Sequence, residues 1–268
     1  MEKIVDVPVQ LLSSIKTDKI CAAITTTQAG VISGVEGFLQ AANRLDLCVE
    51  MHLPEGALLE PQAVISRVIG TPLQIVAGED CLLGYLAKPS GVATAAFKAK
   101  TKAGKIRVVC GGWKKILSEN KVVLRKAAET AGLDSRILNV PFIYLDKNYV
   151  RIFGSIPKAI EAALDIRGRA VVVQLKGETT AIEKEAILAA QAGASVIMVD
   201  TGNILDLRKC SQVLKEEGFR DKVELSFAGG VKLEDLDSMK QEDVDVIDMG
   251  RVILDAPMLD LRYDIIKM

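Results

Sequence analysis

AVVVQLKGETTAIEKEAILAAQAGASVIMVD, the stretch Ala170–Asp200, decides the fold. It consists of an apolar run, an amphipathic segment and a second apolar run, a pattern typical of two parallel strands joined by a helix. Similar apolar runs occur at Ile106–Cys110, Val140–Asp146, Val223–Ala228 and Val244–Gly250. Runs that are apolar throughout are buried on both faces, which favours a parallel α/β barrel over an open doubly wound sheet, the alternative.

The N-terminal part of the chain has a different pattern. Residues 20–75 contain short apolar runs separated by glycine and proline, which predicts strands joined by tight turns around one helix near Gly37–Arg44. A longer helix is predicted over Leu73–Lys102, where apolar residues recur at a spacing of three to four.

The composition excludes several classes of protein. Of the 268 residues, 49% are hydrophobic and 26% are charged, which excludes a disordered, collagen-like or coiled-coil chain. The 34 basic and 35 acidic side chains give a net charge of −1, so we expect neither nucleic acid nor an anionic membrane as a partner. No apolar run approaches the ~18 residues of a membrane span, and Met1–Ile20 lacks the layout of a signal peptide. We therefore expect a soluble, cytoplasmic protein.

The rare residues exclude some chemistry as well. The only histidine is His52, which rules out a histidine-rich metal site and is expected to be a packed or surface residue. The five cysteines form no CxxC pair, which argues against a zinc or redox motif and fits reduced thiols. Cys110 is expected to act as a small buried hydrophobic residue.

In a parallel barrel the working residues lie where the strands end. Gly229-Gly230 and Gly250-Arg251 follow the last two predicted strands. Glycines there let the backbone approach a phosphate, and a following helix would add free N–H groups and a positive dipole end. The alternative is that these glycines only form tight turns.

Two other strand ends carry charge. Asp200 follows an apolar run, so its carboxylate is predicted to bind magnesium or ribose hydroxyls, or else to cap the next helix. Lys114 and Lys115 follow the first run and are predicted to bind a phosphate as point charges, or else to lie in a solvated loop.

At these residues the chain resembles the quinolinate phosphoribosyltransferase family over nearly its whole length. EDCLLGYLAKPSGVAT, Glu79–Thr94, resembles the family helix ER-x-ALN-x-L-x-x-x-SGIAT, and VVCGGWKK, Val108–Lys115, stands at the place of VLDTRKT. RILNVPFIYLDKNY, Arg136–Tyr149, runs without a gap from the arginine of the family's HR pair to the end of its IKDNH motif. VIMVD is similar to IIMLD, LSFAGGV to LEASGGI, and DVIDMGRVILDAPMLDL to DVISVGALTHSAPALDI.

The resemblance implies a fold and an assembly. We expect an N-terminal mixed α/β sandwich domain over residues 1–104, with the tail 252–268 packing back on it, and a partial parallel α/β barrel over 105–251. The family acts as a homodimer with a site built from both subunits, so a homodimer or higher homo-oligomer is expected. The implied ligands are small molecules, phosphoribosyl pyrophosphate or a mononucleotide, with Mg²⁺ as a possible cofactor.

The phosphoribosyl half of the family site is largely matched. Lys114 stands at the family lysine, and Asp200 at its metal-associated acid. Gln174 stands at a family glutamate, although an insertion nearby makes Glu178 the alternative counterpart. The resemblance therefore predicts the catalytic residues Lys114, Asp200 and Gln174, a metal contact at Asp200, and the phosphate-binding residues Gly229, Gly230 and Gly250. Arg251, which follows Gly250 at the same strand end, is the fourth predicted phosphate-binding residue.

The half of the site that holds the two carboxylates of quinolinate is altered. Family cations are replaced by Asp80, Trp113, Ser135 and Asp146. Arg136 is retained, and Lys147 is displaced by one position. The predicted substrate-binding residues are therefore Asp80, Trp113, Arg136, Asp146 and Lys147.

This set predicts an acceptor that is a neutral or cationic N-heterocycle rather than quinolinate. One alternative is a nucleotide- or phosphate-binding regulatory protein without turnover. Another is Schiff-base chemistry on Lys176 or Lys114.

Overall fold

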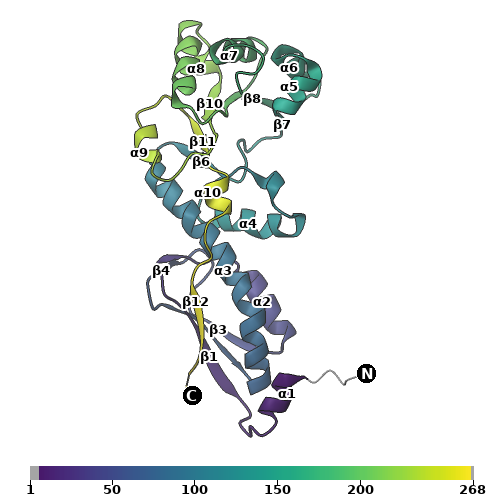
Figure 1. Ribbon diagram of the computed structural model, residues 1–268, viewed down its shortest axis with the longest axis vertical. Coiled ribbons are helices and arrows are strands. Elements are labelled where there is room, and N and C mark those ends of the chain that lie inside the picture. Colours follow the sequence, from purple (N-terminus) through teal and green to yellow (C-terminus); the bar gives the residue numbers. More distant parts are fainter. Residues whose placement is uncertain (1–5, 267–268) are drawn as a thin grey trace. The chain divides into compact units, whose positions relative to one another are not determined.

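The computed structural model describes residues 6–266 in two units (Figure 1). One unit takes in the residues up to Phe97, Leu117–Gly132 and the residues from Asp255 onward, and the other takes in Lys98–Ile116 and Leu133–Leu254. Residues 1–5 and 267–268, the ends of the expected first domain and tail, lie outside the described residues.

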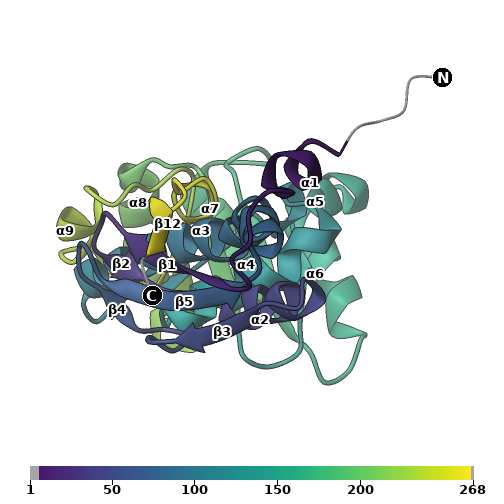
Figure 2. The ribbon, with the colours of Figure 1, turned by 90° about the horizontal axis from the view of Figure 1, so that it is seen from below.

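The N-terminal unit is built on a four-stranded antiparallel sheet. Its order is β12 (Leu261–Ile266), β1 (Ile20–Thr26), β5 (Val64–Gly70) and β3 (Cys48–Met51). Figure 2 shows β1, β5 and β3 side by side. The remaining elements of this unit are α1 (Val7–Leu12), the two-residue strands β2 (Gly30–Val31) and β4 (Leu58–Leu59), α2 (Val35–Arg44), most of α3 (Pro72–Ala103) and α4 (Ser118–Thr130).

The core of this unit lies between the sheet and the helices α2 and α3. Ile24 and Val68 of the sheet belong to one buried cluster with Phe38 of α2 and Leu82 of α3. The prediction of a long helix after the strands is confirmed, since α3 spans Pro72–Ala103. The C-terminal strand β12 completes the sheet by pairing antiparallel with β1.

Helix α4 belongs to this unit, whereas the sequence led us to expect a barrel domain continuous over 105–251. Polar contacts fix it there: Lys126 Nζ lies 2.6 Å from Glu36 Oε2 of α2, and Thr130 Oγ1 donates to Glu55 Oε1 over 3.2 Å. The apolar pattern of a helix does not say which of two cores it packs on, so this assignment needed the structure.

The second unit is a parallel sheet of six strands. Their order is β6 (Arg107–Val109), β11 (Val246–Asp248), β10 (Glu224–Phe227), β9 (Val196–Val199), β8 (Ala170–Leu175) and β7 (Phe142–Leu145). Each neighbouring pair is parallel. Within residues 6–266 no ladder joins β6 to β7, and only an isolated bridge links Val109 to Asp134. The sheet is therefore a partial barrel, as expected.

Helices follow most of these strands (Figure 1). Those that contact the sheet are α5 (Lys147–Phe153), α6 (Ile156–Leu164), α7 (Ile182–Gln191), α8 (Ile204–Glu216) and the 3-10 helix η2 (Arg220–Lys222). The short helices α9 (Leu236–Met239), α10 (Arg251–Leu254) and η1 (Trp113–Lys115) complete the unit. Among the described residues, no helix has the length and apolar character needed to cross a membrane.

The barrel interior is mainly apolar in its middle and polar at both ends. Val109, Val172, Met198 and Val246 form the middle, together with the buried Ser226, the register partner of Met198 and Val246. At the amino ends of the strands, Arg107 pairs with Glu224 over 2.6 Å and donates to the carbonyl of Ile137. The carboxyl ends carry the residues described next.

Candidate active site

Two polar side chains face the barrel interior at the carboxyl ends of the strands. Gln174 is the register partner of Met198, and Asp248 is the register partner of Val109. Register partners point to the same face of a sheet, and both Met198 and Val109 belong to the interior cluster. We call this end of the barrel, with Asp146 and Asp200 at its rim, the barrel mouth.

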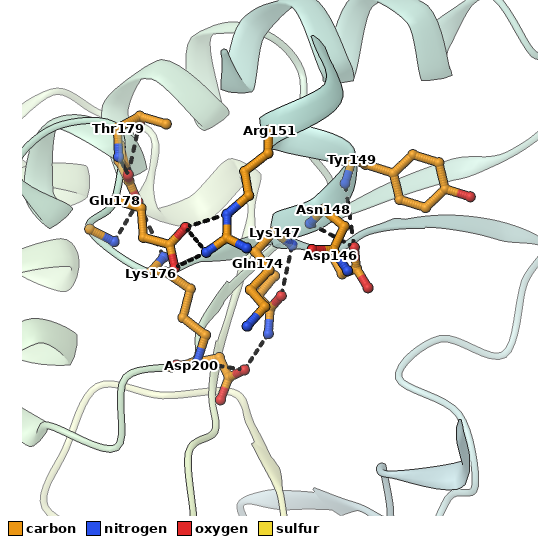
Figure 3. Close-up of polar contacts among 12 residues, drawn as sticks. Asp146, Lys147, Asn148, Tyr149, Arg151, Gln174, Lys176, Glu178, Thr179 and Asp200 are labelled. Carbon is orange, nitrogen blue, oxygen red and sulfur yellow. Dashed lines mark hydrogen bonds and ion pairs between the residues drawn. The ribbon is translucent and has the colours of Figure 1, made fainter. Parts of the chain in front are cut away.

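Gln174 and Lys176 converge on Asp200 (Figure 3). Gln174 accepts a hydrogen bond from the backbone N–H of Lys147 over 2.9 Å and donates one through Nε2 to Asp200 Oδ2. Lys176 Nζ lies 3.1 Å from Asp200 Oδ2 and also donates to the Asp200 carbonyl. The structure therefore brings together two of the predicted catalytic residues, Gln174 and Asp200, with Lys176, which neutralises the carboxylate.

Asp146 is already engaged at the start of α5. Its carboxylate accepts hydrogen bonds from the backbone N–H groups of Asn148, at 2.9 Å, and Tyr149, at 3.4 Å, and so caps the helix (Figure 3). It also lies 3.6 Å from Nζ of Lys114, which is otherwise exposed. Asp146 and Lys114, predicted to bind the acceptor and a phosphate respectively, therefore form a pair with each other.

Trp113 is less accessible than its predicted stacking role requires. The side chain is buried, with 9% exposed, and its indole N–H donates to the carbonyl of Ser135 over 3.2 Å. Stacking needs an open ring face, so the contact of Trp113 with a substrate remains a prediction that requires the indole to be uncovered.

The other predicted acceptor residues are dispersed. Arg136 is exposed in the segment between α4 and β7, and within residues 6–266 it forms no ion pair. Asp80 is exposed on α3, in the N-terminal unit, so its predicted contribution to a partner's site stays a prediction. The backbone of Lys147 contacts Gln174, and its side chain is half-buried.

The glycine loops after β9 and β10 pack backbone against backbone. A Cβ on Gly229, whose φ is 112°, would lie 2.2 Å from the Gly202 nitrogen, and one on Gly202 would lie 2.3 Å from the Gly229 oxygen. Gly230 has a φ of 90° and faces open space. In the described chain, the backbone N–H groups of Gly229, Gly230 and Val231 donate no hydrogen bond, so they are available to an anion.

The expected helix dipoles behind these loops are weak. Helices α9 and α10 have only four residues each, so neither adds much to anion binding. Gly250 instead packs against the backbone of Gly111, where an added Cβ would lie 3.0 Å from its oxygen, and Arg251, which begins α10, is exposed. Phosphate binding at the predicted residues would depend on backbone N–H groups and nearby cations.

Asp248 is the residue of the barrel mouth that our reading of the sequence missed. Its Oδ1 accepts a hydrogen bond from the Gly111 N–H over 2.9 Å, and a Cβ on Gly111 would lie 2.2 Å from Oδ2. Burial, with a smaller contribution from the Asp200 carboxylate, raises the pKa of Asp248 from 3.8 to about 6, although the hydrogen bond from Gly111 N–H favours the charged form. The signal was present in the sequence, because DVID stands where the family has DVIS.

Two protonated groups lie near Asp248. Burial raises the pKa of the Cys110 thiol to about 12, with a contribution from Asp248, so Cys110 is an inert buried side chain, as expected. Burial also raises the pKa of Tyr144, and the carboxylates of Asp248, Asp200 and Asp146 raise it further. The Tyr144 hydroxyl lies 3.1 Å from Met198 Sδ.

Glu178, the alternative counterpart of the family glutamate, forms a two-pronged ion pair. Arg151 Nε and Nη2 each lie 2.9 Å from one of its carboxylate oxygens (Figure 3). The loop that carries Glu178 is fixed from beneath by the buried Glu185, which accepts hydrogen bonds from Gly177 and Thr179. Glu178 is therefore tied to α5, while Gln174 is tied to Asp200.

The carboxylates of the barrel mouth do not form a metal cage. Lys176 and Gln174 hold Asp200, Lys114 and the α5 N-terminus hold Asp146, and Gly111 holds Asp248. Among the described residues, no group of three or more His, Cys, Asp or Glu side chains is placed to hold a metal ion. The donor set does not fit a magnesium ion bound by the protein alone.

Comparison with known proteins identifies the family. A model of the N-terminal domain of quinolinate phosphoribosyl transferase matches residues 6–90, and a model of its C-terminal domain matches residues 92–264. The chain belongs to the quinolinate phosphoribosyl transferase family. The sequence-based assignment to this family is thus confirmed.

Individual relatives agree with this family membership. A probable nicotinate-nucleotide pyrophosphorylase (carboxylating) of Archaeoglobus fulgidus is 26% identical over 259 residues, which cover 96% of this chain and 98% of that protein. The human nicotinate-nucleotide pyrophosphorylase (carboxylating) is 30% identical over 243 residues, which cover 89% of this chain and 80% of that protein. The crystal structure of nicotinate-nucleotide pyrophosphorylase from Pyrococcus furiosus matches the fold with a TM-score of 0.84 at 24% identity, covering 96% of this chain and 71% of that one.

Proposed function

We propose that this family member is a phosphoribosyltransferase whose acceptor is a neutral or cationic N-heterocycle rather than quinolinate. In such a reaction the lone pair of an unprotonated ring nitrogen forms a bond to C1′ of phosphoribosyl pyrophosphate while the C1′–O bond to pyrophosphate breaks. An acceptor that is protonated on the ring nitrogen first loses that proton to solvent. Family membership supports the reaction class. The altered acceptor is supported by the contacts at the positions where the family resemblance places cations.

The pairing of those positions is the observation that carries the proposal. The Trp113 indole N–H is engaged by the backbone carbonyl of Ser135, and Asp146 puts a carboxylate beside Lys114. At 4 Å and an effective dielectric constant of ~20, two like charges repel by about 4 kcal/mol. Even after partial neutralisation by Lys114, Asp146 disfavours a pyridine that carries two carboxylates.

The phosphoribosyl half is assigned to the other edge of the mouth. The unpaired N–H groups of Gly229, Gly230 and Val231 would hold phosphate oxygens. Asp200, oriented by Gln174 and Lys176, would accept hydrogen bonds from ribose hydroxyls. Asp200 is already engaged by Lys176 and Gln174, so these residues do not fit a magnesium ion held by the protein alone.

Calorimetry with the full-length chain tests both halves. We expect binding of phosphoribosyl pyrophosphate or ribose 5-phosphate, and no binding of quinolinate at millimolar concentration. Tight quinolinate binding would overturn the altered acceptor. Absence of binding for phosphoribosyl pyrophosphate, ribose 5-phosphate and a mononucleotide alike would overturn the phosphoribosyl assignment.

A ligand-binding protein without turnover is the second candidate. It is favoured by Gln174, an amide at the place of a family glutamate, and by the engagement of Asp200 with Lys176. Pyrophosphate release separates the two candidates: release that depends on an aminopyridine acceptor supports the enzyme, and binding without release from any N-heterocycle supports the second. Schiff-base chemistry on Lys176 is disfavoured because its ammonium is paired with Asp200.

The assembly and location are further parts of the proposal. We propose a homodimer, because the helix that the family uses to complete its partner's site is matched by Glu79–Thr94. We propose the cytoplasm as its location, because the five cysteines are free thiols. Light scattering at micromolar concentration tests the assembly, and a monomer would contradict a site shared between two subunits.

A further inference from the structure

The three carboxylates of the barrel mouth differ in what neutralises them. Asp146 lies 3.6 Å from the Lys114 ammonium, and Asp200 lies 3.1 Å from the Lys176 ammonium. Asp248 forms no ion pair with any residue of the described chain, 6–266. It is thus the carboxylate at this end of the barrel whose charge the protein leaves uncompensated.

The position of the Asp248 carboxylate is fixed. Its backbone lies in β11 between β10 and β6, and its register partner Val109 shows that the side chain faces the interior. Gly111 N–H holds Oδ1 at 2.9 Å, and any residue larger than glycine at 111 would collide with the carboxylate. Oδ2 accepts no hydrogen bond within residues 6–266.

The groups around Asp248 cannot supply the missing positive charge. Tyr144 and Cys110 are neutral at physiological pH, because burial and nearby carboxylates raise both pKa values. Asp200 adds a like charge. A partly buried carboxylate in these surroundings favours a ligand that brings N–H donors or a positive charge.

We propose that Asp248 sets the acceptor class: its Oδ2 accepts a hydrogen bond from an N–H group of the heterocycle and so selects an amine-bearing or cationic ring. This rests on the proposed function, because it assumes that the acceptor enters the barrel mouth. It adds Asp248 to the residues Asp80, Asp146 and Trp113, for which we predicted such a selection from the sequence. Serine at the corresponding position of the family stretch carries no charge and would not make this selection.

Calorimetric titrations with 4-aminopyridine, which is a cation at neutral pH, test this inference. They are run in the presence of saturating ribose 5-phosphate, on the wild type and on the variants Asp248→Asn and Asp248→Ser. Asparagine keeps the shape of the side chain and can still accept from Gly111 N–H, and serine is the family residue. We expect both variants to lose about ten- to a hundredfold in affinity for 4-aminopyridine, as for the loss of one charge-assisted hydrogen bond.

The control is Asp221→Asn, which removes an exposed carboxylate from η2 of the same unit and should leave 4-aminopyridine affinity unchanged. Equal affinity in the wild type and both Asp248 variants would overturn the inference, as would a wild type that binds ribose 5-phosphate but not 4-aminopyridine. Binding of ribose 5-phosphate tests the proposed function separately. If the wild type does not bind ribose 5-phosphate, that function is overturned. If the Asp248 variants still bind it, any change in 4-aminopyridine affinity concerns the acceptor.

Discussion

The indole N–H of Trp113 donates a hydrogen bond to the carbonyl oxygen of Ser135 over 3.2 Å. These are two of the positions at which the family resemblance places an arginine and a histidine. In this chain the indole N–H is engaged by the backbone at 135. The replacement at 113 is therefore held in place by a hydrogen bond to the chain itself.

The first prediction concerns this pair. Trp113→Phe keeps an aromatic ring but removes the donor, which leaves the Ser135 carbonyl without this partner. We expect the free energy of unfolding to fall by about 1–3 kcal/mol, from the lost hydrogen bond and the smaller buried ring. Urea denaturation measures it, with Tyr149→Phe as the control because Tyr149 is half exposed and its ring points away from Gln174 and Asp200 (Figure 3). An unchanged stability would contradict a structural role for the indole.

The second prediction concerns Asp146 and Lys114. Asp146→Asn keeps a side chain that caps α5 well, but removes the charge beside Lys114. The freed Lys114 ammonium should then attract anions. Quinolinate affinity should therefore rise by about tenfold, which corresponds to roughly 1.4 kcal/mol of binding free energy. Calorimetry on the variant and the wild type measures the change.

The control for the second prediction is Asp206→Asn, in the first turn of α8, which should not alter quinolinate binding. If Asp146→Asn leaves quinolinate affinity unchanged, the charge at 146 is not what excludes that ligand, and the proposed basis of acceptor choice is wrong.

The architecture could be predicted from the sequence because buried parallel strands carry a strong local signal. Runs such as Val196–Val199 are apolar at every position and are buried at every position. The family motifs then gave the order of the domains. The local pattern could not predict the unit to which α4 belongs, because its Lys126 forms an ion pair with Glu36, which is far away in the sequence.

The residues that meet at the barrel mouth were largely predictable from the sequence, but most of the contacts among them were not. The contact between Gln174 and Asp200 could be expected, because strand ends of a parallel sheet meet, while their catalytic roles stay predictions. Their contact with Lys176, and that of Asp146 with Lys114, depend on side-chain reach across neighbouring strands, which no spacing encodes. Asp248 was missed because it lies inside the predicted strand Val244–Gly250, and only the residues at the end of each strand were considered as site residues.

The third prediction concerns the glycine loops. Gly229→Ala places a Cβ 2.2 Å from the Gly202 nitrogen and imposes a φ of 112° on an L residue. Backbone strain of this kind costs about 1–3 kcal/mol, and relief requires the two loops to separate. We expect ribose 5-phosphate binding to be lost and the melting temperature to fall. The matched variant Gly230→Ala has a similar φ but open space around its Cβ, so it should be the milder of the two. Equal retention of binding in both variants would remove these loops from the phosphate site.

The last prediction is the pH dependence of stability that Asp248 introduces. Its pKa is about 6 in the folded chain and 3.8 ordinarily, because burial and Asp200 disfavour the charged form. The folded state therefore holds this proton more tightly, and the stabilisation is complete below pH 3.8 and lost as the pH rises through 6. A pKa difference of this size lowers the free energy of unfolding at pH 8 by roughly 3 kcal/mol, compared with low pH. Asp248→Asn has no such proton, so its stability relative to the wild type should rise by about that amount between pH 4 and pH 8.

Urea denaturation across this range measures the difference, and Asp221→Asn, an exposed carboxylate of the same unit, should show no comparable trend. A constant difference between Asp248→Asn and the wild type would mean that Asp248 is well solvated, and a falling one that the fold stabilises its charge.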